Sequence, residues 1–80
     1  MSHYRLDARR LLCPMPVIRT QNKLEELQTG DTLEVTCSDP GALYDIPAWC
    51  RVHGHEILST SNQAGEITIT LRVIKVNSGE

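Results

Sequence analysis

The chain has 80 residues, of which 40% are hydrophobic and 22% are charged, and its formal net charge is −2. A chain of this length builds one domain near the lower size limit for a self-sufficient core, so we expect a single domain over residues 1–80 with an ordered core from about residue 3 to 75. The negative balance argues against general nucleic-acid binding. The lack of a membrane-length apolar run, and of a signal-peptide core in residues 1–10, predicts a cytoplasmic protein without membrane contact.

The first predicted elements are a short strand and a helix. Apolar and polar residues alternate over Tyr4–Leu6, as in a strand. The run Leu12-Cys13-Pro14-Met15-Pro16 then predicts a helix start, because proline is well tolerated at the first helical positions. Apolar residues at helical spacing extend this helix over Pro14–Leu27, and Thr29-Gly30 is its predicted exit.

The next pair of elements repeats this order. Alternation over 32–37 predicts a half-buried strand with Cys37 on its apolar face. Ser38-Asp39-Pro40 is a second strand-to-helix junction, since a capping residue precedes a proline. The following helix has apolar residues at helical spacing from Leu43 to Val52, is ended by Gly54, and either is kinked at Pro47 or begins near Asp45.

The last predicted elements form a hairpin. Glu56–Thr60 reads as a third strand, residues 61–65 as a loop containing glycine, and Ile67–Val73 as the clearest strand of the chain. Val76–Glu80 is a predicted frayed tail.

The element order βαβαββ predicts an α+β two-layer sandwich. Two crossover helices imply parallel pairing with right-handed connections, and the last two strands pair antiparallel. Strands with one apolar face each suit helices on one side only. We therefore expect a mixed four-stranded sheet with two helices on one face.

Cys13 is the strongest candidate for chemistry in this chain. It lies at or beside the helix N-cap, where the positive end of the helix dipole favours a thiolate, so we expect its pKa to lie below that of a free cysteine. The N–H groups of Met15 and Val17 are candidate donors to its sulfur, because Pro14 and Pro16 have none. A buried cysteine that only fills space is the alternative, and the flanking prolines favour the reactive interpretation.

Charge is divided unevenly along the sequence. Residues 1–23 carry five Lys and Arg side chains against Asp7 alone, a net charge of +4, and the remainder carries three against nine acidic residues, a net charge of −6. Arg9 and Arg10 are candidates to support a thiolate at Cys13 or to dock an acidic partner. A chance asymmetry of the solvated surface is equally compatible with this pattern.

Metal binding and disulfides are not expected. The chain has three cysteines and three histidines, but no CxxC pair of the kind that zinc sites use. Cys37 is expected in the core, and Cys50 half-buried on the second helix. We predict reduced thiols, no metal and no cofactor.

The collected motifs resemble the TusA/SirA-like family of sulfur carriers, the TusA branch most closely. The resemblance rests on Leu6-Asp7-x-Arg9, Cys13-Pro14-x-Pro16, Asp39-Pro40, and Asp45-Ile46-Pro47 followed by Trp49-Cys50. It implies a small sulfurtransferase with a βαβαββ sandwich that holds sulfane sulfur as a persulfide on Cys13.

The resemblance also implies partners. A cysteine desulfurase or a rhodanese would donate the sulfur, and a DsrE/TusD-like protein would accept it, in tRNA 2-thiouridine formation, molybdenum-cofactor synthesis or oxidative sulfur metabolism. The chain departs from the family pattern around the cysteine: Arg10 replaces a usual glycine, Leu12 a frequent charged residue, and Met15 the glutamate common in TusA. A carrier that serves two partners in turn needs an uncovered motif, so we expect a monomer.

Two other functions share this fold. The βαβαββ layout resembles the C-terminal domain of bacterial translation initiation factor three, which allows an RNA-binding module, although the chain has no Phe and a negative balance. A regulatory adaptor would use the same surface without needing Cys13.

Overall fold

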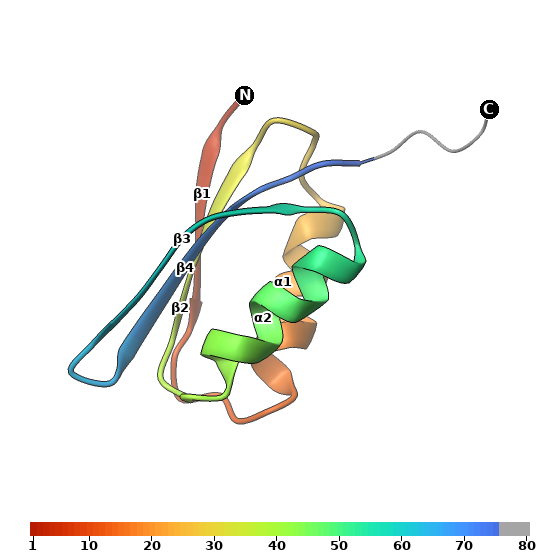
Figure 1. Ribbon diagram of the computed structural model, residues 1–80. Coiled ribbons are helices and arrows are strands. Elements are labelled where there is room, and N and C mark those ends of the chain that lie inside the picture. Colours follow the sequence, from red (N-terminus) through yellow and green to blue (C-terminus); the bar gives the residue numbers. More distant parts are fainter. Residues whose placement is uncertain (76–80) are drawn as a thin grey trace.

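The computed structural model of the protein describes residues 1–75, and within them two helices cover one face of a four-stranded sheet (Figure 1). The elements are β1 (His3–Ala8), α1 (Met15–Glu25), β2 (Thr32–Cys37), α2 (Ala42–Val52), β3 (Glu56–Gln63) and β4 (Glu66–Arg72). The predicted order and the two-layer sandwich are confirmed. The predicted tail Val76–Glu80 lies outside the described residues.

The sheet has the strand order β1-β2-β4-β3. β1 and β2 pair in parallel, as predicted, and β4 pairs antiparallel with both β2 and β3. The second crossover, through α2, therefore does not make β2 and β3 parallel neighbours as expected, because β4 lies between them. β4 alternates strictly between apolar and polar residues. A central position in the sheet lets it bury Ile67, Ile69 and Leu71 against the helices. β3 is mostly polar and exposed, which suits an edge.

The core fills the space between the helices and the sheet. Its largest fully buried side chains include Leu33 and Val35 of β2, the three apolar residues of β4, and Ile46 of α2. Burial of this apolar surface is the main source of stability in a domain this small.

The helix boundaries differ from those predicted. α1 ends at Glu25, and the chain continues through tighter bonds from the Glu26 N–H to the Lys23 carbonyl (3.0 Å) and from the Leu27 N–H to the Leu24 carbonyl (3.2 Å). α2 begins at Ala42 and contains Pro47, so a start near Asp45 was wrong. Proline removes one helical hydrogen bond, but the Pro47 ring is buried in the interface, which offsets that loss.

The β3–β4 loop is shorter than predicted. β3 extends to Gln63, and only Ala64 and Gly65 turn the chain, with φ values of 53° and 85°. Two successive positive φ angles are characteristic of the tight type I′ hairpin turn. Alternation of hydrophobicity could not reveal the last residues of β3, because both faces of this edge strand meet solvent.

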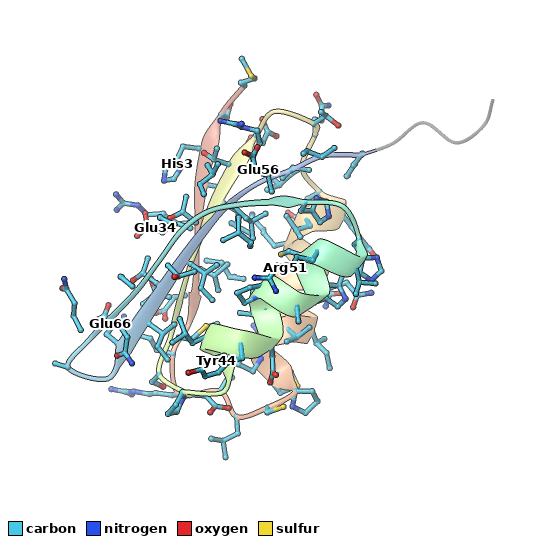
Figure 2. All side chains as sticks on the ribbon, in the orientation of Figure 1. His3, Glu34, Tyr44, Arg51, Glu56 and Glu66 are labelled. Carbon is cyan, nitrogen blue, oxygen red and sulfur yellow. The ribbon has the colours of Figure 1, made fainter. Side chains whose placement is uncertain are left out.

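The sheet face opposite the helices is polar. It carries His3, Glu34 and Thr36, among other charged and hydroxyl side chains, and Figure 2 shows His3 and Glu34 pointing away from the helix layer. The three aromatic residues of the chain lie on the helix side: Tyr4 lies beneath the Lys23 ammonium group, and Tyr44 and Trp49 belong to α2.

Candidate functional site

Cys13 lies in the β1–α1 connection, immediately before the N-cap residue Pro14. Its side chain is exposed, whereas Pro16 is buried in the first turn of α1. The predicted placement beside the start of a helix is confirmed, with the helix beginning at Met15. The peptide bond between Cys13 and Pro14 is cis.

Two carboxylates from the β2–α2 junction contact Cys13. The Cys13 N–H donates to Asp39 Oδ2 at 3.0 Å, and the other oxygen of Asp39 accepts from the Gly41 N–H at 3.0 Å. The Cys13 thiol donates to Asp45 Oδ2, with a sulfur–oxygen distance of 3.6 Å. Asp39 therefore ties the backbone of Cys13 to the second junction, and Asp45 contacts its sulfur.

Asp39 and Asp45 were expected from the sequence as motif residues, without a role at the cysteine. The predicted topology could have indicated that these residues lie near Cys13. Because β1 and β2 run in parallel, their carboxyl ends and the connections that follow meet at one edge of the sheet.

The pKa of Cys13 is raised, which contradicts the predicted lowering. Partial desolvation is the largest cause, followed by the hydrogen bond to Asp45 and the negative charges of Asp45 and Asp39. The Met15 N–H donates to the Leu12 carbonyl at 2.8 Å and is not available to the sulfur.

Arg9 and Arg10 lie in the β1–α1 connection that also carries Cys13. Arg9 forms a bidentate ion pair with Asp7, in which Nε donates to Oδ1 at 2.9 Å and Nη2 donates to Oδ2 at 3.0 Å. This pair lowers the pKa of Asp7 to about 2. The Arg10 backbone N–H donates to Ser38 Oγ at 2.8 Å. Its φ of 67° lies in the left-handed region, where glycine would avoid the steric cost that a side chain incurs.

Exposed apolar side chains come from the segments on either side of Cys13. Leu12 is 77% exposed and Tyr44, next to Asp45, is 74% exposed; Met15 and Ile18 on α1 are 36% and 38% exposed. Apolar side chains this exposed beside a reactive group are typical of a protein-docking surface.

The other two cysteines are inaccessible. Cys37 and Cys50 are each 0% exposed, and burial raises the pKa of each to about 11. Cys37 lies in the core as predicted, whereas Cys50 is fully rather than half buried. All three thiols are free, and only Cys13 presents its sulfur to solvent.

The histidines near the end of α2 have structural contacts. The His53 ring stacks on Trp49 with centroids 4.1 Å apart, and His55 Nδ1 accepts from the Ile74 N–H at 3.0 Å. Among residues 1–75, no three His, Cys, Asp or Glu side chains converge as a metal site would require. No helix in this part of the chain has the length and apolarity to span a membrane.

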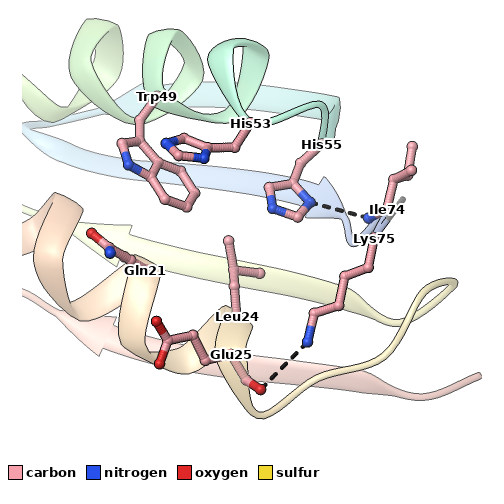
Figure 3. A pocket seen from close by; sticks show the side chains of 8 residues that line it. All are labelled: Gln21, Leu24, Glu25, Trp49, His53, His55, Ile74 and Lys75. Atoms are coloured by element: carbon pink, nitrogen blue, oxygen red, sulfur yellow. Dashed lines mark hydrogen bonds between the residues drawn. The ribbon is translucent and has the colours of Figure 1, made fainter. Parts of the chain in front are cut away.

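A cavity of about 400 Å³ lies at the far end of the helix layer from Cys13 (Figure 3). Leu24 and Gln21 line it from α1, Trp49 from α2, and His55 and Lys75 from the segments that follow α2 and β4. Cys13 precedes the first residue of α1, so the cavity is separate from the cysteine site.

Comparisons with known proteins agree with the motifs. The sequence model of the family described as sulfurtransferase TusA matches residues 4–73. The sulfur carrier protein TusA of Pseudomonas aeruginosa is 39% identical over 67 residues, covering 84% of this chain and 85% of that protein. Bacillus subtilis YrkI is 43% identical over 58 residues, covering 72% and 77%.

Two further similarities extend this picture. Bacillus subtilis YrkF is 42% identical over 62 residues, covering 78% of this chain, but the chain spans only 33% of YrkF. A SirA-like protein from Desulfitobacterium hafniense has the same fold, with a TM-score of 0.79 and 23% identity, covering 90% of this chain and 99% of that one.

Proposed function

The chain belongs to the TusA family of sulfur carriers, and from this membership we propose that Cys13 is the residue that carries the sulfur, as a persulfide. The observation that supports this most strongly is exposure: Cys13 is exposed, whereas Cys37 and Cys50 are 0% exposed. A nucleophile must reach a sulfur atom on another protein, and only an exposed thiol does so.

The transfer is a displacement at sulfur. The Cys13 sulfur attacks the sulfane sulfur of a donor persulfide, forming a new S–S bond. The S–S bond of the donor breaks, and the donor sulfur keeps the electron pair and takes up the proton that Cys13 releases. One sulfur atom moves without net oxidation or reduction, so the reaction needs no cofactor and is that of a sulfurtransferase.

The partners we propose are a cysteine desulfurase or a rhodanese as donor and a DsrE/TusD-like protein as acceptor. The exposed apolar residues Leu12, Met15 and Tyr44 support docking of a protein at this edge. A monomer in the cytoplasm, which leaves the edge uncovered, fits a carrier that meets two partners in turn. The sulfur then serves tRNA thiolation, molybdenum-cofactor synthesis or sulfur oxidation.

Loading and weighing the protein tests the assignment. After incubation with polysulfide, the intact mass should rise by one sulfur atom in the wild type, in Cys37→Ala and in Cys50→Ala, and this gain should vanish in Cys13→Ser. Treatment with a reductant should remove the added mass. A gain that persists in Cys13→Ser would show that the sulfur is carried elsewhere.

The RNA-binding alternative has less support. Sequence-specific RNA recognition by a sheet uses aromatic side chains on its open face, and Tyr4, Tyr44 and Trp49 all lie on the helix side. A binding measurement with single-stranded RNA at physiological salt should therefore detect no specific complex.

A further inference from the structure

The charge around Cys13 is unusual for a nucleophilic thiol. Reactive cysteines commonly lie beside Lys, Arg or His, which stabilise the thiolate. Here the thiol donates to Asp45 Oδ2 at 3.6 Å, and Asp39 accepts from the N–H of the same residue. The sulfur is thus exposed and held against negative charge.

The other groups that face Cys13 do not cancel this charge. Arg9, on the same connection, forms a bidentate ion pair with Asp7. Arg10 is the remaining cation on this connection, but neither arginine is among the causes of the shift in the Cys13 pKa. Asp45 of α2 therefore contacts the sulfur directly, and Asp39 of the β2–α2 junction adds a second negative charge at the backbone of the same residue.

We propose that Asp45 holds Cys13 as a resting thiol, and that a cationic side chain beside the partner's reactive cysteine releases it by pairing with the Asp45 carboxylate. This inference rests on the proposed function. Asp45 is a positioning residue in this scheme: it aims the Sγ atom and sets its charge, and it forms no bond to the transferred sulfur.

The scheme requires a particular partner chemistry. A docked Lys or Arg attracts the Asp45 carboxylate, which frees the thiol hydrogen and removes the repulsion on a forming thiolate. Cys13 then attacks the sulfane sulfur, and its proton passes to the departing donor sulfur. The terminal sulfur of the new persulfide is anionic at neutral pH, and the same partner cation stabilises it while the complex lasts.

Selection of a basic partner protects the free carrier. Between transfers the thiol form reacts slowly with oxidants and alkylating agents, because the thiolate is the nucleophile. When a partner without the cation docks, little of Cys13 becomes thiolate. The two carboxylates therefore select which donor persulfides can load the protein.

The first test measures the reactivity of Cys13 alone. Iodoacetamide alkylation of Cys13 is followed against pH in the wild type, Asp45→Asn, Asp45→Glu and the control Glu26→Gln, whose charge lies at the other end of α1. The midpoint should fall by about one pH unit in Asp45→Asn and stay near the wild-type value in the other two. An unchanged midpoint in Asp45→Asn would overturn the proposal.

The second test measures partner selection. Two synthetic peptides carry the same persulfidated cysteine, flanked by arginine in one and by glutamine in the other. At low salt the wild type should take sulfur about tenfold faster from the arginine peptide, and this ratio should approach one in Asp45→Asn and at high salt. Glu26→Gln should keep the wild-type ratio.

The outcomes separate the two proposals. If Cys13 accepts sulfur from both peptides with the same ratio in the wild type and Asp45→Asn, the role of Asp45 is wrong and the carrier function stands. If neither peptide loads Cys13 in any variant, the carrier function itself is contradicted. Circular dichroism of Asp45→Asn checks that α2 is retained, and Asp45→Glu supplies a second variant that keeps the charge.

Discussion

Cys13 differs from Cys37 and Cys50 in its exposure, and it is the cysteine whose thiol donates a hydrogen bond to a carboxylate, that of Asp45. Burial alone raises the pKa of Cys50, whereas Cys13 is exposed and has its pKa raised partly by two carboxylates. Desolvation and like charge act in the same direction on a thiol, but only the second can be reversed by a docked partner. The reactivity of Cys13 is therefore open to control by whatever covers it.

At the same scale, His55 should make the stability of the protein depend on pH. Its Nδ1 accepts from the Ile74 N–H, and partial burial lowers its pKa below the ordinary 6.5. As the pH falls, the unfolded state takes up a proton at this histidine at a higher pH than the folded state does. The contribution of His55 to stability is therefore fully present above pH 6.5 and is lost as the pH drops below it.

Urea denaturation between pH 7.5 and 5.5 measures this dependence. His55→Asn keeps an acceptor near the Ile74 N–H and does not titrate, so its stability should decline less over this range than that of the wild type. His53→Asn, at an exposed position, is the matched control and should retain most of the slope. Equal slopes in the wild type and His55→Asn would contradict the prediction.

At the scale of elements, the β3–β4 hairpin departs from the ideal for its turn type. Ala64 has a φ of 53°, in the left-handed region that costs an L-residue with a Cβ about 1 to 2 kcal/mol. Asn tolerates this region better, and Asn-Gly is the strongest sequence for a type I′ turn. Ala64 followed by Gly65 is therefore a weak turn that β3 and β4 hold together by their pairing.

Ala64→Asn should stabilise the protein by about 0.5 to 1 kcal/mol, because the new residue suits the backbone that the hairpin imposes. Chemical denaturation measures the change in the free energy of unfolding. Ala48→Asn is the matched control: Ala48 is an exposed residue of α2, where Asn is a poorer helix former than Ala, so this variant should lose stability. A loss in Ala64→Asn would argue against the turn geometry.

At the scale of the whole molecule, one topological fact assembles the site. The residues joined to Cys13 lie 26 and 32 positions along the chain, and the parallel pairing of β1 and β2 brings the two strand–helix junctions to one edge. The packing of α2 on the sheet, through Ile46 and Cys50, then fixes Asp45 beside the sulfur. The site depends on the core beneath it.

Ile46→Ala tests how much this core residue contributes to the stability of the protein. Ile46 is 0% exposed and adjoins Asp45 in sequence, so its truncation should destabilise the protein by about 2 to 5 kcal/mol, a large part of the total for a small domain. Ile46→Val is the matched control, with an expected cost of about 0.5 to 1.5 kcal/mol. Thermal denaturation measures both, and a cost for Ile46→Ala no larger than that for Ile46→Val would contradict the role of this core residue.

The sequence by itself determined the element order, the layers and the family. Alternation over β2 and β4, helical spacing after Pro16 and the motif around Cys13 are local signals, since each depends on residues close together in the chain. Boundaries were less accurate where burial was absent, as in β3, or where packing overrode a local rule, as at Pro47.

Only the tertiary structure decided the position of β4 between β2 and β3 and the electrostatics of Cys13. The sequence placed a helix N-terminus and two arginines beside the sulfur and so predicted a lowered pKa. Folding instead brought Asp39 and Asp45 to it and paired Arg9 with Asp7. Electrostatic energy depends on distance in space, and carboxylates 26 and 32 residues away along the chain contact Cys13, one at its backbone N–H and one at its sulfur.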